Sequence, residues 1–325
     1  MPIQPAPDSR AARTGNFDAA IFGLIVADLI ATPFDLRRPP APGGLSVIDS
    51  ITLTTGGNVC NVGVAMAKLG MRVAAAGLVG QDALGHAVRE ILEREGVDTA
   101  AVFDAPRGQT SASVVAVEPG GERVFYHTPG VTPLLDAAVF RQCIPMLQWC
   151  SFVQVGYFGL LPGLTKDLPV LLAELKKVSP RTRVALDTVY PPGAPELLWP
   201  ILPHVDLFAP SRKEAELLTG ETDPAKMVAA FRAHMPRGLI GIKLDADGCY
   251  LDDGLTTARA PACNVGVVDT TGAVDTWFGA LMTALAKGMP LEPAGRFANR
   301  AAADCCTALG ASAGIRPFEE TLARM

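Results

Sequence analysis

The chain has 325 residues, of which 49% are hydrophobic, so it can bury a large core in one domain or two. Its net charge is −5, and basic pairs such as Arg37-Arg38 and Lys176-Lys177 are short and scattered, which argues against a nucleic-acid partner. Residues 1–16 lack the apolar segment of a secretory signal, and the longest apolar run, 19–27, is too short to span a bilayer. We therefore expect a cytoplasmic protein with a flexible tail over residues 1–16 and no membrane partner.

The seven cysteines are odd in number and contain no C-x-x-C pair, which predicts buried thiols in a reducing compartment. The four histidines are far apart in the sequence and lack the spacing of metal ligands. No protein-bound structural metal is expected.

Strand-like and helix-like patterns alternate along most of the chain. Buried strands are expected at 19–26, 72–79, 152–155, 184–186, 207–209 and 239–244, and helices at 59–69, 84–96, 168–178 and 225–234. Asp223 and Pro224 suit the N-cap and first turn of the last of these helices. The alternation predicts a three-layer α/β/α fold with a doubly wound, mostly parallel sheet over residues 17–325.

Two insertions, at about 30–55 and 107–129, break this alternation. The first is rich in Pro and Gly and then strand-like at 46–54; the second resembles a hairpin of 112–117 and 123–127 joined at Gly120-Gly121. Neither has a helix to cover it, so we expect a small β-sheet lid over a substrate cleft. Its uncovered face is expected to contact a substrate or another subunit.

The segment from Asp269 to Asp275 reads Asp-Thr-Thr-Gly-Ala-Val-Asp, between an apolar run at 265–268 and a helical pattern. A strand that turns through glycine into a helix gathers free backbone N–H groups at the positive end of the helix dipole, where phosphate binds well. Asp275 lies in the first turn, where its carboxylate can take a proton from an attacking hydroxyl. A simple capping role is the alternative for this aspartate.

Three further polar features precede or open the first helix. Gly56 and Gly57 allow a ligand close to the backbone, and Asn61 offers both a donor and an acceptor to a hydroxyl group. Asp28 follows the first expected strand, at the sheet edge where α/β proteins bind ligands. The alternatives are a plain turn for Gly56 and Gly57, a helix residue bonded to backbone for Asn61, and a loop-capping role for Asp28.

These segments resemble the two signatures of the ribokinase-like (PfkB-type) carbohydrate kinases, Gly-Gly-x-x-x-Asn…Leu-Gly and Asp-Thr-x-Gly-Ala-Gly-Asp. The resemblance runs from about residue 18 to 317. It implies ATP-dependent phosphorylation of a sugar hydroxymethyl group, with Asp275 as the base. It also implies an anion hole from the amides of Gly272, Ala273, Val274 and Asp275, and a sugar site formed by Asp28, Gly56, Gly57 and Asn61.

The resemblance assigns nucleotide-side and metal roles as well. It implies that Lys243, as a mobile charge, meets the ATP phosphates with Asp245 and Gly248, and that Asn299 flanks the adenine. Glu214 matches a residue in the outer shell of Mg²⁺, although it also completes a capping box with Ser211. Asp269 and Thr271 mark where the family is activated by a monovalent cation such as K⁺, and the family implies a homodimer through the lid.

Departures from the family pattern cluster on the nucleotide side, at Ser211, Asp245 and Val274. A valine forced to positive φ is strained, and its isopropyl group can crowd a phosphate. A sugar-binding protein with weak or no kinase activity is therefore the second hypothesis. A nucleoside kinase is the third, with Phe34 and Phe125 of the lid as stacking partners for a base.

Overall fold

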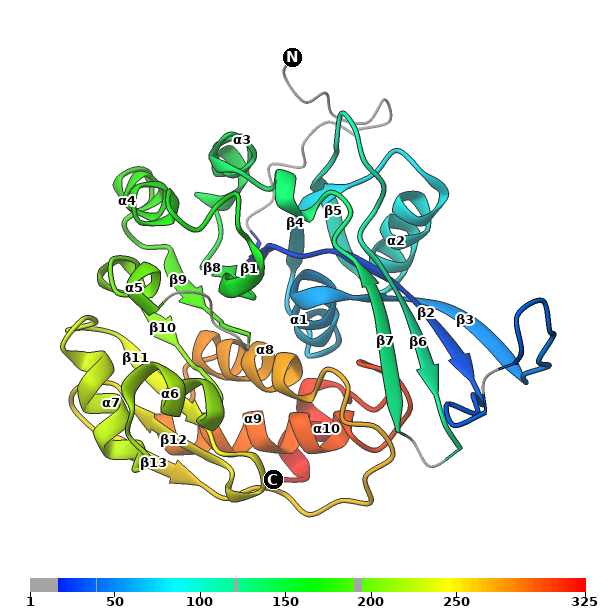
Figure 1. Cartoon of the computed structure of the whole chain (residues 1–325). Coiled ribbons are helices and arrows are strands. Elements are labelled where there is room, and N and C mark those ends of the chain that lie inside the picture. The colour runs from blue at the N-terminus through cyan, green and yellow to red at the C-terminus, as the bar shows by residue number, and fades with distance from the viewer. Residues whose placement is uncertain (1–16, 39, 120–121, 190–194) are drawn as a thin grey trace.

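The computed structural model describes residues 17–38, 40–119, 122–189 and 195–325; the tail expected at 1–16 and the Gly120-Gly121 turn lie outside these ranges. Within them the main sheet has nine strands in the order β13-β12-β11-β10-β9-β8-β1-β4-β5 (Figure 1). All pairs are parallel except those that β12 makes with β11 and β13. The strands are Ala19–Phe22 (β1), Val73–Val79 (β4), Val97–Asp104 (β5), Phe152–Val155 (β8), Arg183–Leu186 (β9), Leu207–Phe208 (β10), Leu239–Lys243 (β11), Cys249–Asp252 (β12) and Thr257–Ala260 (β13).

Helices cover both faces of this sheet, which confirms the three-layer prediction. One face packs against Ala137–Leu147 (α3), Leu168–Val178 (α4), Pro195–Leu198 (α5), Arg212–Thr219 (α6) and Pro224–Arg232 (α7). The other packs against Gly57–Lys68 (α1), Ala83–Arg94 (α2), Ala273–Ala286 (α8) and Leu291–Cys305 (α9), with Phe318–Ala323 (α10) on α9. Single 3₁₀ turns lie at Thr132–Leu134, Phe158–Leu160, Leu202–His204 and Asp245–Asp247. Asp223 caps α7 as expected, since its side chain accepts the Lys226 N–H.

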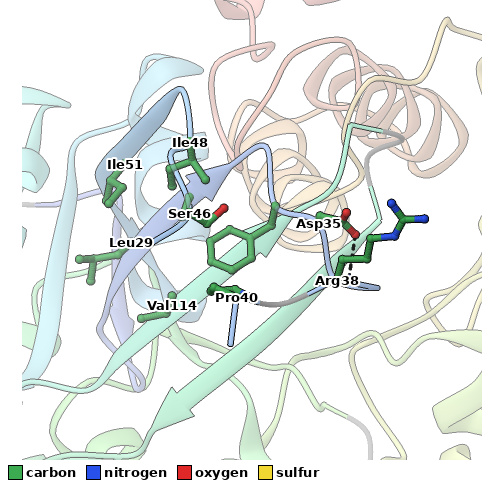
Figure 2. Close-up of a pocket in the computed structure, with 10 residues that line it drawn as sticks. Leu29, Asp35, Arg38, Pro40, Ser46, Ile48, Ile51 and Val114 are labelled. Carbon is green, nitrogen blue, oxygen red and sulfur yellow. Dashed lines mark hydrogen bonds between the residues drawn. The ribbon is translucent and has the colours of Figure 1, made fainter. Parts of the chain in front are cut away.

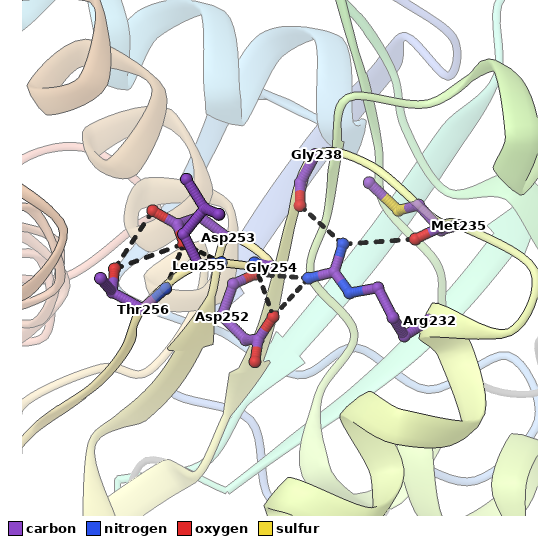
Figure 3. Close-up of polar contacts among 8 residues, drawn as sticks. All are labelled: Arg232, Met235, Gly238, Asp252, Asp253, Gly254, Leu255 and Thr256. Carbon is purple, nitrogen blue, oxygen red and sulfur yellow. Dashed lines mark hydrogen bonds and ion pairs between the residues drawn. The ribbon is translucent and has the colours of Figure 1, made fainter.

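The edge of the sheet is tied to α7 through Arg232 (Figure 3). Its guanidinium donates to the carbonyls of Met235 and Gly238 and to the backbone carbonyl of Asp252, at 2.8 to 3.2 Å. It therefore joins the end of the helix, the start of β11 and the end of β12. This anchor fixes the strand whose carboxyl end carries Lys243.

A second, smaller sheet stands beside the main one (Figure 1), with strands in the order β3-β2-β6-β7. The strands are Val26–Thr32 (β2), Ser50–Gly56 (β3), Ala112–Val117 (β6) and Arg123–Thr128 (β7). The hairpin predicted at 112–127 is confirmed, whereas β3 begins at residue 50 instead of 46.

Two sequence predictions about strands are wrong. The run expected as one strand at 19–26 splits, because Gly23 adopts φ +149° and lets the chain leave the main sheet; Asp28 consequently lies within β2 and not at the end of β1. The apolar run at 265–268 forms no strand, and Val267 and Val268 are exposed. That segment crosses from the sheet edge to α8 with no neighbouring strand to pair with (Figure 1).

In the described part of the chain, no helix combines the length and apolar character needed to traverse a bilayer.

Candidate active site

The junction between the small sheet and α1 brings Asp28 over the glycine pair. A Cβ atom at Gly56 would lie 2.1 Å from Asp28 Oδ2, and one at Gly57 would lie 2.4 Å from the carbonyl oxygen of Leu24. Gly57 also has φ +80°, so both positions require glycine. The predicted grouping of these three residues is thus realised in the structure.

A polar row follows from Asp28 across the inner face of the small sheet. Asp28 pairs in register with Ser113, and the Ser113 hydroxyl lies 3.2 Å from Nδ1 of His127. Burial raises the pKa of Asp28, while the Ser113 hydroxyl and His127 act in the opposite direction. The row offers donors and acceptors to a polyhydroxyl ligand.

Asp275 lies in the first turn of α8 and is only 3% exposed. Its Oδ2 accepts hydrogen bonds from Asn61 Nδ2 and from the Tyr157 hydroxyl, each at 2.8 Å. Its Oδ1 is buried and has no hydrogen-bond partner among the described residues. The carboxylate is thus buried in polar surroundings, with one oxygen held by two donors and the other unsatisfied.

The pKa of Asp275 reflects two opposing influences. Burial raises it above the ordinary aspartate value, whereas the bonds from Asn61 and Tyr157 and the charge of Lys243 lower it. Such tuning brings a carboxylate nearer to the pKa that a general base needs.

Tyr157 owes its position to unusual backbone geometry. It has φ 53° in the left-handed region, directly after β8 and Gly156. A non-glycine residue held there typically costs about 1–3 kcal/mol, and such residues cluster at functional sites. Burial raises the pKa of Tyr157 above that of a free tyrosine, so its phenol stays protonated and donates to Asp275.

A buried ion pair lies near the carboxylate of Asp275. Lys243, at the end of β11, donates to Oδ1 of Asp187 at 3.0 Å, just past the end of β9, and both side chains are nearly inaccessible. Burial raises the pKa of Asp187 to about 7; Lys243 opposes that rise, and Glu214 and Asp275 add to it. Lys243 is therefore a fixed interior charge and not the mobile one expected from the sequence.

The turn before α8 has the geometry of an anion site. Gly272 is the N-cap with φ +72°, and the first helical bond runs from Thr276 N to its carbonyl, at 2.7 Å. The amides of Val274 and Asp275 precede that bond, as expected of donors at a helix start, whereas Ala273 N–H donates to Thr270 O at 3.3 Å.

The strain anticipated at Val274 does not arise. Tyr157 and Asp245 are the non-glycine residues with positive φ in the described ranges, and Val274 has a helical backbone with a 47% exposed side chain. Gly272 supplies the left-handed turn instead, and a Cβ atom there would lie 2.6 Å from Ala311 Cβ. The valine keeps its N–H in the turn.

A second nucleotide-side departure, Asp245, is also accommodated. It takes φ 53°, in the left-handed region, and its side chain is exposed. Arg212 donates to Leu244 O at 3.0 Å and pairs with Asp247, so one of the two nearby carboxylates is neutralised. Gly248, at φ +87°, passes so close to Ala260 O that a Cβ atom would lie 2.0 Å away.

Asn299 and Glu214 both carry structural bonds. The amide of Asn299 accepts from Trp277 Nε1 at 2.8 Å and donates to the carbonyls of Ala260 and Pro261 at 2.9 and 2.8 Å, so its polar atoms are engaged within the protein.

Glu214 completes the capping box with Ser211, accepting the Ser211 N–H on Oε2 at 2.7 Å, and is buried. Nowhere in residues 17–38, 40–119, 122–189 and 195–325 do three or more His, Cys, Asp or Glu side chains gather in a group able to hold a metal ion.

Asp269 connects the anion turn to two distant segments. Its carboxylate accepts from Thr271 N at 2.7 Å and Gly310 N at 2.8 Å, and it pairs with Arg123 of β7 at 2.6 Å. Arg123 also donates to the Thr271 hydroxyl. Burial acts to raise the pKa of Asp269, but these bonds outweigh burial and lower it.

Comparison with known proteins identifies the family of the chain. The family model described as "pfkB family carbohydrate kinase" matches residues 16–317. The chain belongs to the pfkB family of carbohydrate kinases.

Individual relatives are distant but match over most of their length. A ribokinase of Haemophilus influenzae is 27% identical over 307 residues (93% of this chain, 96% of the relative), and a probable fructokinase-3 of Arabidopsis thaliana is 27% identical over 310 residues (89% and 86%). The structure of Arabidopsis thaliana ribokinase complexed with ribose and ATP superposes with a TM-score of 0.78 at 22% identity, covering 95% of this chain and 98% of that one.

Sequence reasoning missed several residues of this pfkB-family site. Ser113 and His127 lie opposite each other across the predicted hairpin, so the pairing of two polar residues in register could have found them. Asp187 directly follows the strand predicted at 184–186, and this position at a strand end was a signal that could have identified it as a site residue. No sequence signal pointed to Tyr157 or Arg123, because their contacts join residues 118 and 146 to 148 positions apart.

Proposed function

We propose that the chain transfers a phosphoryl group from ATP to a hydroxymethyl group of a sugar, with Asp275 as the general base. One observation carries this proposal: Asp275 Oδ1 is buried, unpartnered and set in the first turn of α8, while Oδ2 is held by Asn61 and Tyr157. An unsatisfied carboxylate oxygen in such a place is suited to accept the proton of a bound hydroxyl.

The sugar would lie between the small sheet and α1. Asp28 and Asn61 face this junction, and the absence of side chains at Gly56 and Gly57 leaves room for hydroxyl groups close to the backbone. In this arrangement the small sheet is a lid over the acceptor.

The transferred phosphoryl group would meet the start of α8. The amides of Gly272, Val274 and Asp275 and the charge of Lys243 stabilise the negative charge that develops on its oxygens. Lys243 is fixed in the interior, so it would act on the phosphoryl group as a positive charge in a constant position.

The nucleotide would extend from there past Asp245 and Gly248 toward Asn299. Asn299 shapes this end of the site through its bonds to residues 260 and 261. Mg²⁺ on the ATP phosphates would neutralise their charge, with the buried carboxylate of Glu214 in its outer shell.

We prefer the kinase to a sugar-binding protein with weak or no activity. That alternative rested on the departures at Ser211, Asp245 and Val274, and the helical backbone of Val274 removes the strain expected there. The nucleoside alternative loses Phe34, which lines a groove with Leu29 and Val114 on the opposite face of the small sheet; Phe125 does lie on the inner face, beside Asp28.

An ATP-consumption screen over ketoses, aldoses, sugar acids and nucleosides tests the proposal. We expect turnover with at least one sugar that is lost in Asp275→Asn and kept in Glu90→Gln, a control at an exposed carboxylate of α2. Sugar binding by calorimetry with ATP turnover at background would contradict the kinase and leave the receptor hypothesis.

We also propose that two copies associate through the outer face of the small sheet. This face carries an apolar groove of about 350 Å³ lined by residues such as Leu29, Ile51 and Val114 (Figure 2). Ile51 and Tyr126 on the same face are largely exposed. Light scattering should give a dimer for the native chain and a monomer for Ile51→Arg; a native monomer at high concentration would refute the dimer.

A further inference from the structure

Arg123 belongs to the small sheet but makes its contacts in the main body. It is the first residue of β7, and its guanidinium pairs with Asp269 at 2.6 Å and donates to the Thr271 hydroxyl. Asp269 is 4% exposed in this pair, so the interaction is shielded from water and from salt. A charge-assisted bond from an arginine to a buried carboxylate is strong, and the two terminal nitrogens of Arg123 bridge Asp269 and Thr271.

The surroundings of Asp269 do not fit a monovalent cation, which the family resemblance placed here. Oδ1 accepts from Thr271 N at 2.7 Å and pairs with Arg123, and Oδ2 accepts from Gly310 N at 2.8 Å. Both carboxylate oxygens therefore face N–H donors, and a guanidinium already supplies the positive charge. A K⁺ ion at this carboxylate would lie against that charge.

Asp269 is also where three segments meet. The backbone amides of Val268 and Asp269 donate to Cys306 O at 2.8 and 3.2 Å, and Gly310 comes from the same stretch as Cys306. Three residues further along, Gly272 packs on Ala311 and opens α8. The position of Asp269 consequently sets the position of the amides that start the helix.

We propose that Arg123 is the built-in cation of this turn: it replaces a monovalent ion and fastens the small sheet to the amides that receive the phosphoryl group. Arg123 is thus a positioning residue, and the inference rests on the proposed kinase function. One contact orders both the sheet that carries Asp28 and the turn that carries Asp275. The kinase accordingly works without K⁺.

The test compares the native chain with Arg123→Met and Arg123→Lys, and with Arg107→Met as a control at an exposed arginine between β5 and β6. Turnover is measured in potassium, sodium and tetramethylammonium chloride at equal ionic strength. We expect the native chain and the control to be insensitive to the cation. Arg123→Met should lose about tenfold or more of its rate in tetramethylammonium and recover part of it in K⁺. The rate of Arg123→Lys should fall between those of the native chain and Arg123→Met, because lysine keeps the charge but lacks the planar guanidinium that contacts both Asp269 and Thr271.

Thermal melting in the same salts gives a readout that needs no substrate. K⁺ should raise the melting temperature of Arg123→Met relative to tetramethylammonium and leave the native chain unchanged. Native turnover or melting that rises specifically with K⁺ would overturn the inference, as would full activity of Arg123→Met. A native chain with no turnover on any acceptor would instead contradict the kinase proposal, and the melting curves would still decide the role of Arg123.

Discussion

Replacing Tyr157 by Phe should shift the pH dependence of the reaction. The change removes one of the two donors to Asp275 Oδ2 and leaves the Asn61 bond in place. A hydrogen bond to a charged group contributes about 1.5–3 kcal/mol. At about 1.36 kcal/mol per pKa unit, its loss should raise the pKa of Asp275 by roughly one to two units.

The direction of the shift follows from the role of the carboxylate. A general base works only when deprotonated, so the rate falls as pH drops through its pKa, which burial has already raised. In Tyr157→Phe the acid limb of kcat should therefore move to higher pH, while the plateau rate changes little. A residue that only filled space would not move this limb.

The assay should quantify ADP directly between about pH 5 and 9, which avoids coupling enzymes with their own pH dependence. Tyr126→Phe, at an exposed tyrosine on the outer face of the small sheet, is the matched control and should reproduce the native profile. An acid limb that stays in place in Tyr157→Phe would show that the phenol does not donate to the base during turnover.

Three further substitutions probe other parts of the site. Gly56→Ala should push Asp28 aside, since the new Cβ would meet its carboxylate at 2.1 Å, and steady-state kinetics should show KM for the sugar raised by about tenfold or more; an unchanged KM would remove Asp28 from the acceptor site. Val274→Gly should leave kcat/KM within a few-fold and lower stability by at most about 0.5 kcal/mol in denaturant titrations, whereas a large gain in kcat would mean that the valine crowds the phosphate. Lys243→Met should leave Asp187 buried without its cation and lower the free energy of unfolding by about 3–5 kcal/mol near pH 8. The loss should be smaller near pH 6, because the Asp187 carboxyl, whose pKa is raised to about 7, is then mostly protonated; equal losses at both pH values would contradict the charge argument.

Local sequence patterns located six of the nine described strands of the main sheet and the two helix starts at the site, whereas β5, β12 and β13 were not predicted. Asp275 was placed in the first turn of a helix because a glycine and then a 3.6-residue apolar pattern follow the Asp-Thr-Thr triplet. The apolar runs at 152–155 and 168–178 matched β8 and α4 to the residue, since both are buried in the core.

Features that depend on contacts between distant residues could not be predicted from the sequence. The burial of Lys243 depends on Asp187, 56 positions away, and the turn at Asp269 depends on Arg123, which is 146 positions away. The sequence also did not reveal that Gly272 makes the left-handed turn, two residues before Val274, and that Val274 therefore does not need a positive φ. Each of these outcomes is set by packing between elements and not by propensity within one.

Under the proposed function the acceptor site is divided between the two sheets, which bears on the loss of ATP to hydrolysis. Asp28 belongs to the small sheet, whereas Asn61 and Asp275 belong to helices on the main one. A polyol is long enough to contact both sides at once, and only such a molecule gains the binding energy of both. Water is too small to do so, and under the proposed function we therefore expect slow hydrolysis of ATP when no sugar is bound.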